Sequence, residues 1–207
     1  MEHKFIFDLD STITKKEILP AIAERFDLGK IVRKETEAAM CGAVPFAESF
    51  SRRVALLAHC PVSEASDLVA GIPLNEGIAA FIRKNPESCY IATGNLDVWI
   101  EKLVAALGAL EGHVFCSKAV AKGDCTLEVS EVFGPEQKAE LVRRLGVRHN
   151  TVAIGDGAND IEMCRAADIG IAFGGVREIP EGLRFACGQI FSSDRECAEF
   201  LNHLIGV

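Results

Sequence analysis

Short apolar runs that end in polar turns recur along the chain and predict the strands of a sheet. Residues 5–7 and 151–154 are such runs, and acidic residues follow each of them almost at once. Consecutive apolar positions suit a strand buried on both faces, as in a parallel sheet that helices cover on both sides. Residues 88–92, 169–173 and 189–191 are further strand candidates. The chain is therefore expected to contain a mostly parallel sheet.

Apolar residues at helical spacing lie between these runs. Strands that alternate with helices indicate an α/β fold with right-handed crossovers. Residues 17–70 carry helical patterns only, with Gly29 as the expected stop of the first helix, so a helical block follows the first strand. The predicted helices cover residues 18–26, 31–40, 46–57, 62–69, 78–82, 100–107, 135–145 and 196–204.

Length and charge narrow the class of protein. The 207 residues are enough for one core and a small inserted domain. The net charge of −8 argues against nucleic acid or an anionic membrane surface as partner, and no apolar run of 18 residues could span a membrane. Eight cysteines without a Cys-x-x-Cys pair or a signal peptide indicate free thiols in the cytoplasm. The expected oligomeric state is a monomer or a homodimer.

Two acids follow the first predicted strand. Side chains alternate along a strand, so Asp8 and Asp10 should leave on the same side, into the crevice at the carboxyl end of a parallel sheet. Two carboxylates there repel each other unless a cation or a proton relieves them, and Mg²⁺ is the hard cation that prefers carboxylate oxygens. The alternative is a polar turn in which Ser11 or Thr12 caps the next helix.

A second stretch favours the metal site. The run at residues 151–154 ends in Gly-Asp-Gly-Ala-Asn-Asp at residues 155–160, and a helical pattern follows. The two glycines let the backbone bend and leave room beside a bound ion. Two strand ends that each carry paired acids indicate one shared metal site, to which Asp156 and Asp160 contribute.

These two stretches resemble the first and fourth motifs of the haloacid dehalogenase-like phosphohydrolases. Within that superfamily the chain resembles the phosphoserine phosphatase family over nearly its whole length. The resemblance implies a Rossmann-like parallel-sheet core of residues 1–14 and 74–207, with a small α-helical cap of residues 15–73 inserted over the crevice. It also implies Mg²⁺-dependent hydrolysis of O-phospho-L-serine to serine and phosphate through an aspartyl-phosphate intermediate.

The resemblance assigns roles to the acids. Asp8 is the expected nucleophile, since a carboxylate beside Mg²⁺ can attack phosphorus. Asp10 is the expected general acid and then general base, and its backbone carbonyl is an expected metal ligand. Asp156 should bind Mg²⁺ together with Asp8, and Asp160 should hold a water of the ion or orient its ligands.

A lysine and a strand end complete the expected catalytic groups. Lys138, eighteen residues before Asp156, matches the third motif and would neutralise phosphoryl charge. Taken alone it could be a surface lysine, and Lys118 and Lys122 are its rivals. The remaining expected contacts to substrate are the Thr93 hydroxyl and Gly94 N–H, which match the second motif and would bind phosphate oxygens, and Asn159.

The second motif departs from the family. Ser-Gly-Gly followed by an aromatic residue is usual there, whereas this chain has Thr93-Gly94-Asn95-Leu96. Asn95 and Leu96 are expected to alter the pocket wall. The alternative function is therefore a phosphatase or phosphotransferase that acts on another small phosphorylated metabolite.

The helical block indicates the substrate. Arg53 shares an apolar helical stripe with Phe46, and an arginine on such a face needs a partner. By resemblance Arg53 binds the carboxylate of phosphoserine, Glu17 binds its ammonium group, and Met40 and Phe46 form apolar walls. The alternatives are a surface-directed side chain or an ion pair for Arg53, and a helix-dipole role for Glu17.

Overall fold

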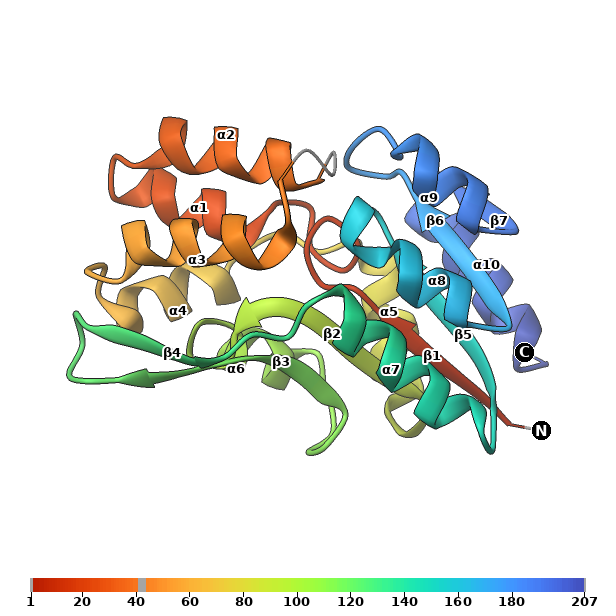
Figure 1. The fold of residues 1–207 in the computed structure, drawn as a ribbon. Coiled ribbons are helices and arrows are strands. Elements are labelled where there is room, and N and C mark those ends of the chain that lie inside the picture. Colours follow the sequence, from red (N-terminus) through yellow and green to blue (C-terminus); the bar gives the residue numbers. More distant parts are fainter. Residues whose placement is uncertain (1, 41–43, 207) are drawn as a thin grey trace.

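One sheet organises the molecule (Figure 1). The computed structural model describes residues 2–40 and 44–206, except for the side chains of residues 37–40. Within these residues the strand order is β4-β3-β2-β1-β5-β6-β7, and β4 is the one strand antiparallel to its neighbour, which confirms the predicted parallel sheet. The strands are β1 (His3–Phe7), β2 (Cys89–Leu96), β3 (Val114–Ala121), β4 (Leu127–Glu131), β5 (Asn150–Gly155), β6 (Ile169–Phe173) and β7 (Gln189–Phe191).

The helices follow the predicted periodicity with one correction. The first helix ends at Arg25, and Gly29, predicted as its stop, is instead the first residue of the second. The turn lies at Asp27, whose φ of 60° is left-handed, and the Leu28 N–H returns to the Ala23 carbonyl at 2.8 Å. The helices are α1 (Ile18–Arg25), α2 (Gly29–Met40), α3 (Phe46–Leu57), α4 (Val62–Ala70), α5 (Glu76–Lys84), α6 (Asp97–Ala106), α7 (Pro135–Gly146), α8 (Ile161–Ala166), α9 (Glu181–Ala186) and α10 (Asp194–Leu204), with 3₁₀ turns η1 (Pro86–Ser88) and η2 (Ala158–Asp160).

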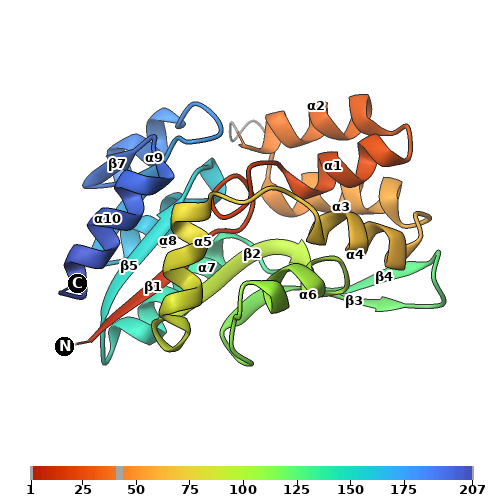
Figure 2. The ribbon, with the colours of Figure 1, turned by 180° about the vertical axis from the view of Figure 1, so that it is seen from behind.

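The central strand β1 shows why its sequence is apolar at every position. Phe5 and Phe7 face one side of the sheet, where the Phe5 ring meets Phe81 of α5 edge-on at a centroid distance of 4.9 Å. Ile6 faces the other side and belongs to the cluster that includes Leu141 of α7. Figure 2 shows α5, α6 and α10 on one face of the sheet, and Figure 1 shows α7 and α8 on the other. Both faces are therefore buried under helices.

Helices α1–α4 form a separate layer beyond the ends of β1 and β2 (Figures 1 and 2). The chain enters and leaves this layer at one place, because Thr14 forms a β-bridge with Leu74 and the Lys15 N–H donates to the Pro73 carbonyl at 2.7 Å. The β3–β4 hairpin also contacts the layer, where Asp124 accepts from the Ser63 N–H and hydroxyl, both at 3.0 Å. The limits of 15–73 for a cap domain stay a prediction.

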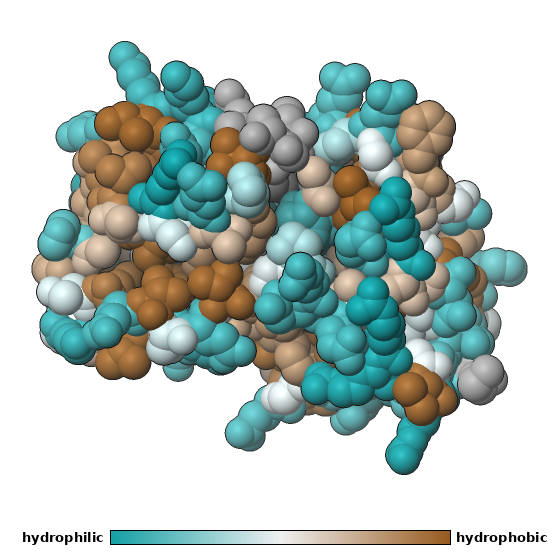
Figure 3. All heavy atoms as spheres, in the orientation of Figure 1, coloured by the Kyte–Doolittle hydropathy of each residue, from teal (hydrophilic) through white to brown (hydrophobic). Residues whose placement is uncertain are grey.

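The surface of the molecule is uneven in polarity. On the face seen in Figure 3, hydrophobic residues gather over the helical layer, whereas the side over α7 and α8 is mostly hydrophilic. In the layer, Ile31 of α2 and Leu56 of α3 are exposed. Among the described residues, no helix is both long and apolar enough to cross a bilayer.

Candidate active site

The ends of β1 and β5 bring three carboxylates together. Phe7 pairs with Ile154 in the sheet, and the Asp8 N–H extends the pairing by donating to the Ile154 carbonyl at 2.9 Å. The two acidic stretches therefore leave neighbouring strands at the same level. Asp8, Asp156 and Asp160 are buried, and each offers an oxygen within 4.8 Å of the others. The predicted meeting of the two stretches is confirmed.

Lys138 of α7 lies between two of these acids. Its Nζ is 2.5 Å from Asp8 Oδ1 and 2.7 Å from Asp160 Oδ1, and no part of the residue is exposed. Although burial opposes its charge, the carboxylates of Asp160 and Asp8 raise the pKa of Lys138 above its usual value, so it stays protonated. Its rivals are elsewhere: Lys118 lies 3.6 Å from Asp97, and Lys122 pairs with Glu128 on the hairpin.

The remaining oxygens of the cluster fit a divalent cation. Within the described part of the chain, Asp8 Oδ2 and both carboxylate oxygens of Asp156 are buried without a hydrogen-bond partner. Burial, and next the charge of Asp160, raise the pKa of Asp8 to about 8, and burial with the charge of Asp8 raises the pKa of Asp156 well above its usual value. Such a group of unsatisfied carboxylates costs free energy that a bound cation would remove.

Asp160 differs from the other two acids in its contacts. Its Oδ2 accepts from the backbone N–H groups of Asp156 and Gly157 at 3.2 and 3.1 Å, while its Oδ1 accepts from Lys138. Both oxygens are thus already bonded. This arrangement suits a residue that holds the loop and the lysine in place around a metal, the second of the two roles expected for Asp160.

Asp10 lies in the turn after β1 and caps α1 from outside the helix. Its Oδ1 accepts from the Ile18 N–H at 2.6 Å, and its Oδ2 accepts from the Asn95 side-chain amide. The alternative in which Ser11 or Thr12 caps the next helix was wrong, because Asp10 accepts from the first N–H of α1. Ser11 instead adopts a left-handed φ of 55°, which turns the chain and places its hydroxyl 2.9 Å from Glu17 Oε1. Burial raises the pKa of Asp10, whereas its two hydrogen bonds oppose that rise.

The second-motif segment belongs to strand β2, which runs on to Leu96 instead of ending at residue 92. The pairing of β2 with β3 shifts between Thr93 and Leu96, which lets the strand carry a local bend. The Thr93 hydroxyl is buried and accepts from Asn95 N–H and Nδ2 at 3.2 and 3.1 Å. Leu96 belongs to the core, so its predicted place in the pocket wall was wrong, whereas Asn95 does line the cavity.

Gly94 lies against the helical layer. A methyl group at residue 94 would overlap the ring of Phe46, the first residue of α3. Phe46 in turn stacks on Phe50 at a centroid distance of 5.6 Å. Glycine is therefore needed where the second motif and the layer meet, and Phe46 takes the predicted position as an apolar wall.

Arg53 of α3 is a buried cation without a carboxylate partner among the described residues. It is 4% exposed, and its Nε and Nη1 donate to the Ser49 carbonyl at 3.2 Å and the Thr36 hydroxyl at 3.0 Å. Burial lowers the pKa of Arg53, and the charge of Asp10 opposes that effect. Neither a surface-directed side chain nor an ion pair describes it. Its neighbour Arg52 is exposed and pairs with Glu48.

A small cavity lies between the acids at the strand ends and the helical layer. Its volume is about 30 Å³, room for only one or two water molecules. Acids of the sheet and residues of the helical layer share its wall. The lining residues are Asp8, Asp10, Glu17, Leu19, Phe46, Phe50, Arg53, Gly94, Asn95 and Asn159.

Three predicted substrate residues have different outcomes. Asn159 lines the cavity, and its Oδ1 is buried with no hydrogen-bond partner in the residues that the structure describes. Thr93 is bonded to Asn95 and is not part of the cavity wall. The side chain of Met40 lies outside the described part of the structure.

Arg177 is a site residue that the sequence reasoning missed. It lies between β6 and α9, forms an ion pair with Glu17, and donates to the Ser11 hydroxyl at 3.1 Å. Its Nε lies 2.7 Å from Asp156 Oδ2, a close charge contact without hydrogen-bond alignment. A sequence feature that could have led to Arg177 is the Gly174-Gly175 pair after β6. A strand that ends in this pair places the following loop at the same edge of the sheet as the acids.

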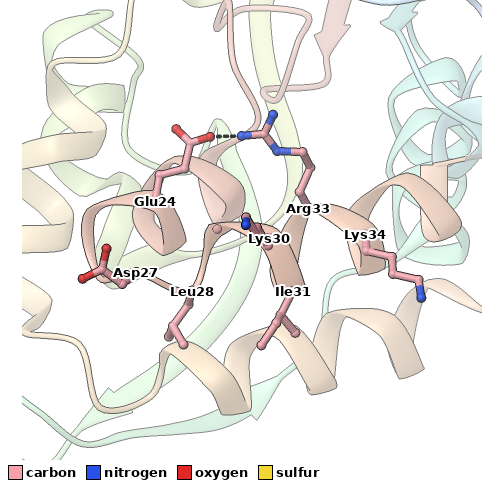
Figure 4. Close-up of a pocket in the computed structure, with 8 residues that line it drawn as sticks. Glu24, Asp27, Leu28, Lys30, Ile31, Arg33 and Lys34 are labelled. Atoms are coloured by element: carbon pink, nitrogen blue, oxygen red, sulfur yellow. Dashed lines mark hydrogen bonds and ion pairs between the residues drawn. The ribbon is translucent and has the colours of Figure 1, made fainter.

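A larger hollow on the surface is not this site. It has a volume of about 870 Å³ and lies on the outer side of the helical layer. Figure 4 shows Glu24 and Arg33 facing each other across it. None of the predicted site residues lines it, so the small cavity between sheet and layer is the better candidate.

Comparisons with known proteins agree with this geometry. The model of the haloacid dehalogenase-like hydrolase family matches residues 5–165. The phosphoserine phosphatase of Methanocaldococcus jannaschii is 32% identical over 178 residues, which are 81% of this chain and 83% of the relative. The phosphoserine phosphatase of Archaeoglobus fulgidus is 33% identical over 81% of this chain, which spans about half the length of that relative.

Solved structures show the same fold. A substrate-bound phosphoserine phosphatase complex superposes with a TM-score of 0.83 at 26% identity, over 98% of both chains. A phospho-aspartyl intermediate analogue of phosphoserine phosphatase superposes with a TM-score of 0.82 at 27% identity, over 97% of this chain and 99% of that one.

Proposed function

Since the chain belongs to the haloacid dehalogenase-like hydrolases, as a phosphoric monoester hydrolase of the phosphoserine phosphatase family, we propose that it hydrolyses O-phospho-L-serine to serine and phosphate. The observation that carries this proposal is Arg53, a buried guanidinium that has no carboxylate partner among the described residues and lines one cavity together with Asp8 and Asp10. A planar guanidinium can hold the substrate carboxylate with two parallel hydrogen bonds while the phosphate lies at Asp8.

The catalytic steps follow from the contacts of the acids. The Asp8 carboxylate is the group available to attack phosphorus, which would give an aspartyl-phosphate. Lys138 holds Asp8 Oδ1 and keeps a positive charge beside the transferring phosphoryl group. Asp10, placed by the Ile18 N–H and by Asn95, would protonate the leaving serine oxygen and later take a proton from water.

The metal of this proposal is Mg²⁺, held by Asp8, the Asp10 carbonyl and Asp156, with Asp160 orienting the site. When bound, it would neutralise phosphate oxygens and the three acids at once. Carboxylate oxygens are the ligands that Mg²⁺ prefers, and the unpartnered oxygens of Asp8 and Asp156 support this choice.

Substrate entry requires the helical layer to move. The cavity of about 30 Å³ is too small for phosphoserine. Phe46 and Arg53 belong to α3, so displacement of that helix from the strand ends would enlarge the cavity. Closure afterwards would exclude water and bring Arg53 onto the substrate.

The test compares neighbouring arginines. Arg53→Lys keeps a charge but loses the two-pronged hydrogen bonding, so kcat/KM for phosphoserine should fall about 30-fold, the equivalent of roughly 2 kcal/mol. Phosphoethanolamine, which lacks the carboxylate, should be hydrolysed equally by both enzymes. Arg52→Lys is the matched control and should leave both rates unchanged, because Arg52 pairs with Glu48 on the surface. An equal loss with both substrates would contradict a carboxylate-binding role.

The second candidate function is action on another small phosphorylated metabolite, by hydrolysis or by transfer to an alcohol. Asn95 supports this second function. The residue departs from the usual second motif, and its side-chain amide donates to Asp10, the expected general acid. Phosphate release from a panel of monoesters, with product analysis in the presence of an acceptor alcohol, separates the two. Preference for a monoester without both carboxylate and ammonium groups would replace phosphoserine as the substrate.

A further inference from the structure

Glu17 is not free in this structure, although the proposed substrate needs its carboxylate. Its Oε1 accepts the Ser11 hydroxyl at 2.9 Å and forms an ion pair with Arg177. The side chains of Glu17 and Arg177 are 17% and 23% exposed, so the pair is largely shielded from solvent. A substrate ammonium group would have to take the place that the guanidinium holds.

The same guanidinium approaches the metal site. Nε of Arg177 lies 2.7 Å from Asp156 Oδ2, one of the two unpartnered oxygens of that acid. A cation bound there would repel the guanidinium at this distance. One side chain therefore stands at both places where positive charge must arrive: the substrate's ammonium group at Glu17 and the metal at Asp156.

The position of Arg177 between two cavities supports this interpretation. Glu17 lines both the catalytic cavity and an outer hollow of about 440 Å³. Ser11 and Arg177 line only the outer hollow, so their contacts with Glu17 form part of the wall between the two spaces. Displacement of Arg177 from Glu17 would remove part of that wall and connect the outer hollow with the catalytic cavity.

We propose that Arg177 is a specificity-determining residue, whose guanidinium occupies Glu17 and Asp156 until an ammonium-bearing substrate and the metal displace it. The proposal rests on the proposed function for the identity of the substrate. A phosphate ester without an ammonium group leaves the Glu17–Arg177 pair intact, whereas phosphoserine must break it. Arg177 thus weakens binding of phosphoserine relative to its amine-free analogue, and it competes with the metal.

The first experiment measures KM for phosphoserine and for 3-phosphonooxypropanoate, which is phosphoserine without its amine. In Arg177→Gln, KM for phosphoserine should fall about fivefold relative to that for the analogue, a typical size for coupling between sites. A rise in KM for both substrates would show that Arg177 grips the substrate and would overturn the proposal. An unchanged KM ratio would overturn it as well.

The second experiment measures Mg²⁺ binding to the metal-free protein by calorimetry. Arg177→Gln should bind Mg²⁺ about fivefold more tightly, because the Asp156 carboxylate loses its competing cation. Arg33→Gln is the matched control: it removes a charge from the same outer hollow, where Arg33 pairs with Glu24, and should leave Mg²⁺ affinity unchanged. Equal affinity in wild type and Arg177→Gln would overturn the proposal.

A second variant, Arg177→Lys, keeps the proposal testable if Arg177→Gln does not fold. Arg177→Lys keeps the charge but loses the planar guanidinium that donates from two nitrogens, so both effects should appear with the same sign and smaller size. If wild type did not hydrolyse phosphoserine, the proposed function would fail. The Mg²⁺ titration would still decide on Arg177, because it needs no substrate.

Discussion

The two halves of the site are built in different ways. The sheet half consists of acids fixed by neighbouring strands, with Lys138 wholly buried between Asp8 and Asp160. The helical half consists of long side chains, Arg53 and Glu17, that reach the cavity from α3 and from the start of α1. Strand register fixes the first set within the core, whereas the second set is carried by helices whose two chain connections to the core meet at the Thr14–Leu74 bridge.

This difference separates chemistry from selection. Phosphoryl transfer needs groups held in a fixed geometry, which the carboxyl edge of a buried parallel sheet supplies. Selection of the substrate needs groups that can withdraw for entry and then close, which a helical layer supplies. Changes in the sheet half should therefore abolish turnover, and changes in the helical half should alter KM and substrate preference.

The substitution in the sheet half with the largest expected effect on activity is Asp8→Asn. The amide cannot attack phosphorus, so phosphate release should fall about 10³-fold or more with every monoester. Circular dichroism should show an unchanged fold, because the substitution keeps the size of the side chain. Activity within tenfold of wild type would contradict the role of Asp8 as nucleophile.

Lys138→Met tests the central ion pairs. The variant leaves Asp8 and Asp160 without their buried cation, so the free energy of unfolding should fall by about 3–5 kcal/mol and kcat by about 10²-fold. Urea unfolding with and without Mg²⁺ is the measurement, and Mg²⁺ should recover part of the loss. Lys118→Met, on the exposed hairpin, is the control. Equal stability of Lys138→Met and wild type would contradict this account.

The raised pKa of Asp8 predicts how pH acts on the metal-free protein. The pKa of an unfolded Asp is about 3.9, whereas burial raises the pKa of the folded Asp8 carboxyl to about 8, so the folded state binds the proton more tightly. The corresponding stability is present below about pH 3.9 and is lost as the pH rises through about 8. Mg²⁺ must displace that proton, so its affinity should increase over the same range.

Thermal unfolding at pH 5 and pH 8, with and without Mg²⁺, checks this pH dependence. The stabilisation by Mg²⁺ should be larger at pH 8. Asp8→Asn should weaken the dependence, because the amide has no proton to lose. The same stabilisation at both pH values would show that Asp8 is ionised throughout.

The smallest expected effect lies where the hairpin meets the helical layer. Asp124→Ala removes a carboxylate that accepts from the Ser63 N–H and hydroxyl in the first turn of α4, at a partly solvated position. The loss should be about 1 kcal/mol of unfolding free energy, as for other helix caps, with kcat unchanged. A large loss of kcat would show that the hairpin controls the site.

The sequence predicted the sheet half of the site well. The acids at Asp8, Asp10 and Asp156 follow apolar strands, and parallel strands that end together must bring such residues to one edge. Lys138 lies between Asp8 and Asp160, and Arg53 lines the cavity, while the roles that the resemblance implies for both stay predictions. One strand limit differs from the prediction: β2 runs to Leu96 instead of ending at residue 92, so Leu96 enters the core while Asn95 faces the cavity.

What the sequence by itself determined is therefore the set of charged groups at the site: buried strands that deliver carboxylates to a glycine-containing turn, and a lysine in the helix before that turn. Tertiary structure alone decided which charges are neutralised. Asp10 caps α1 eight residues along the chain, and Arg177 reaches Glu17 and Asp156 from far along the chain. Periodicity reports only which face of an element is buried, whereas the partner of a long polar side chain depends on contacts between elements distant in sequence.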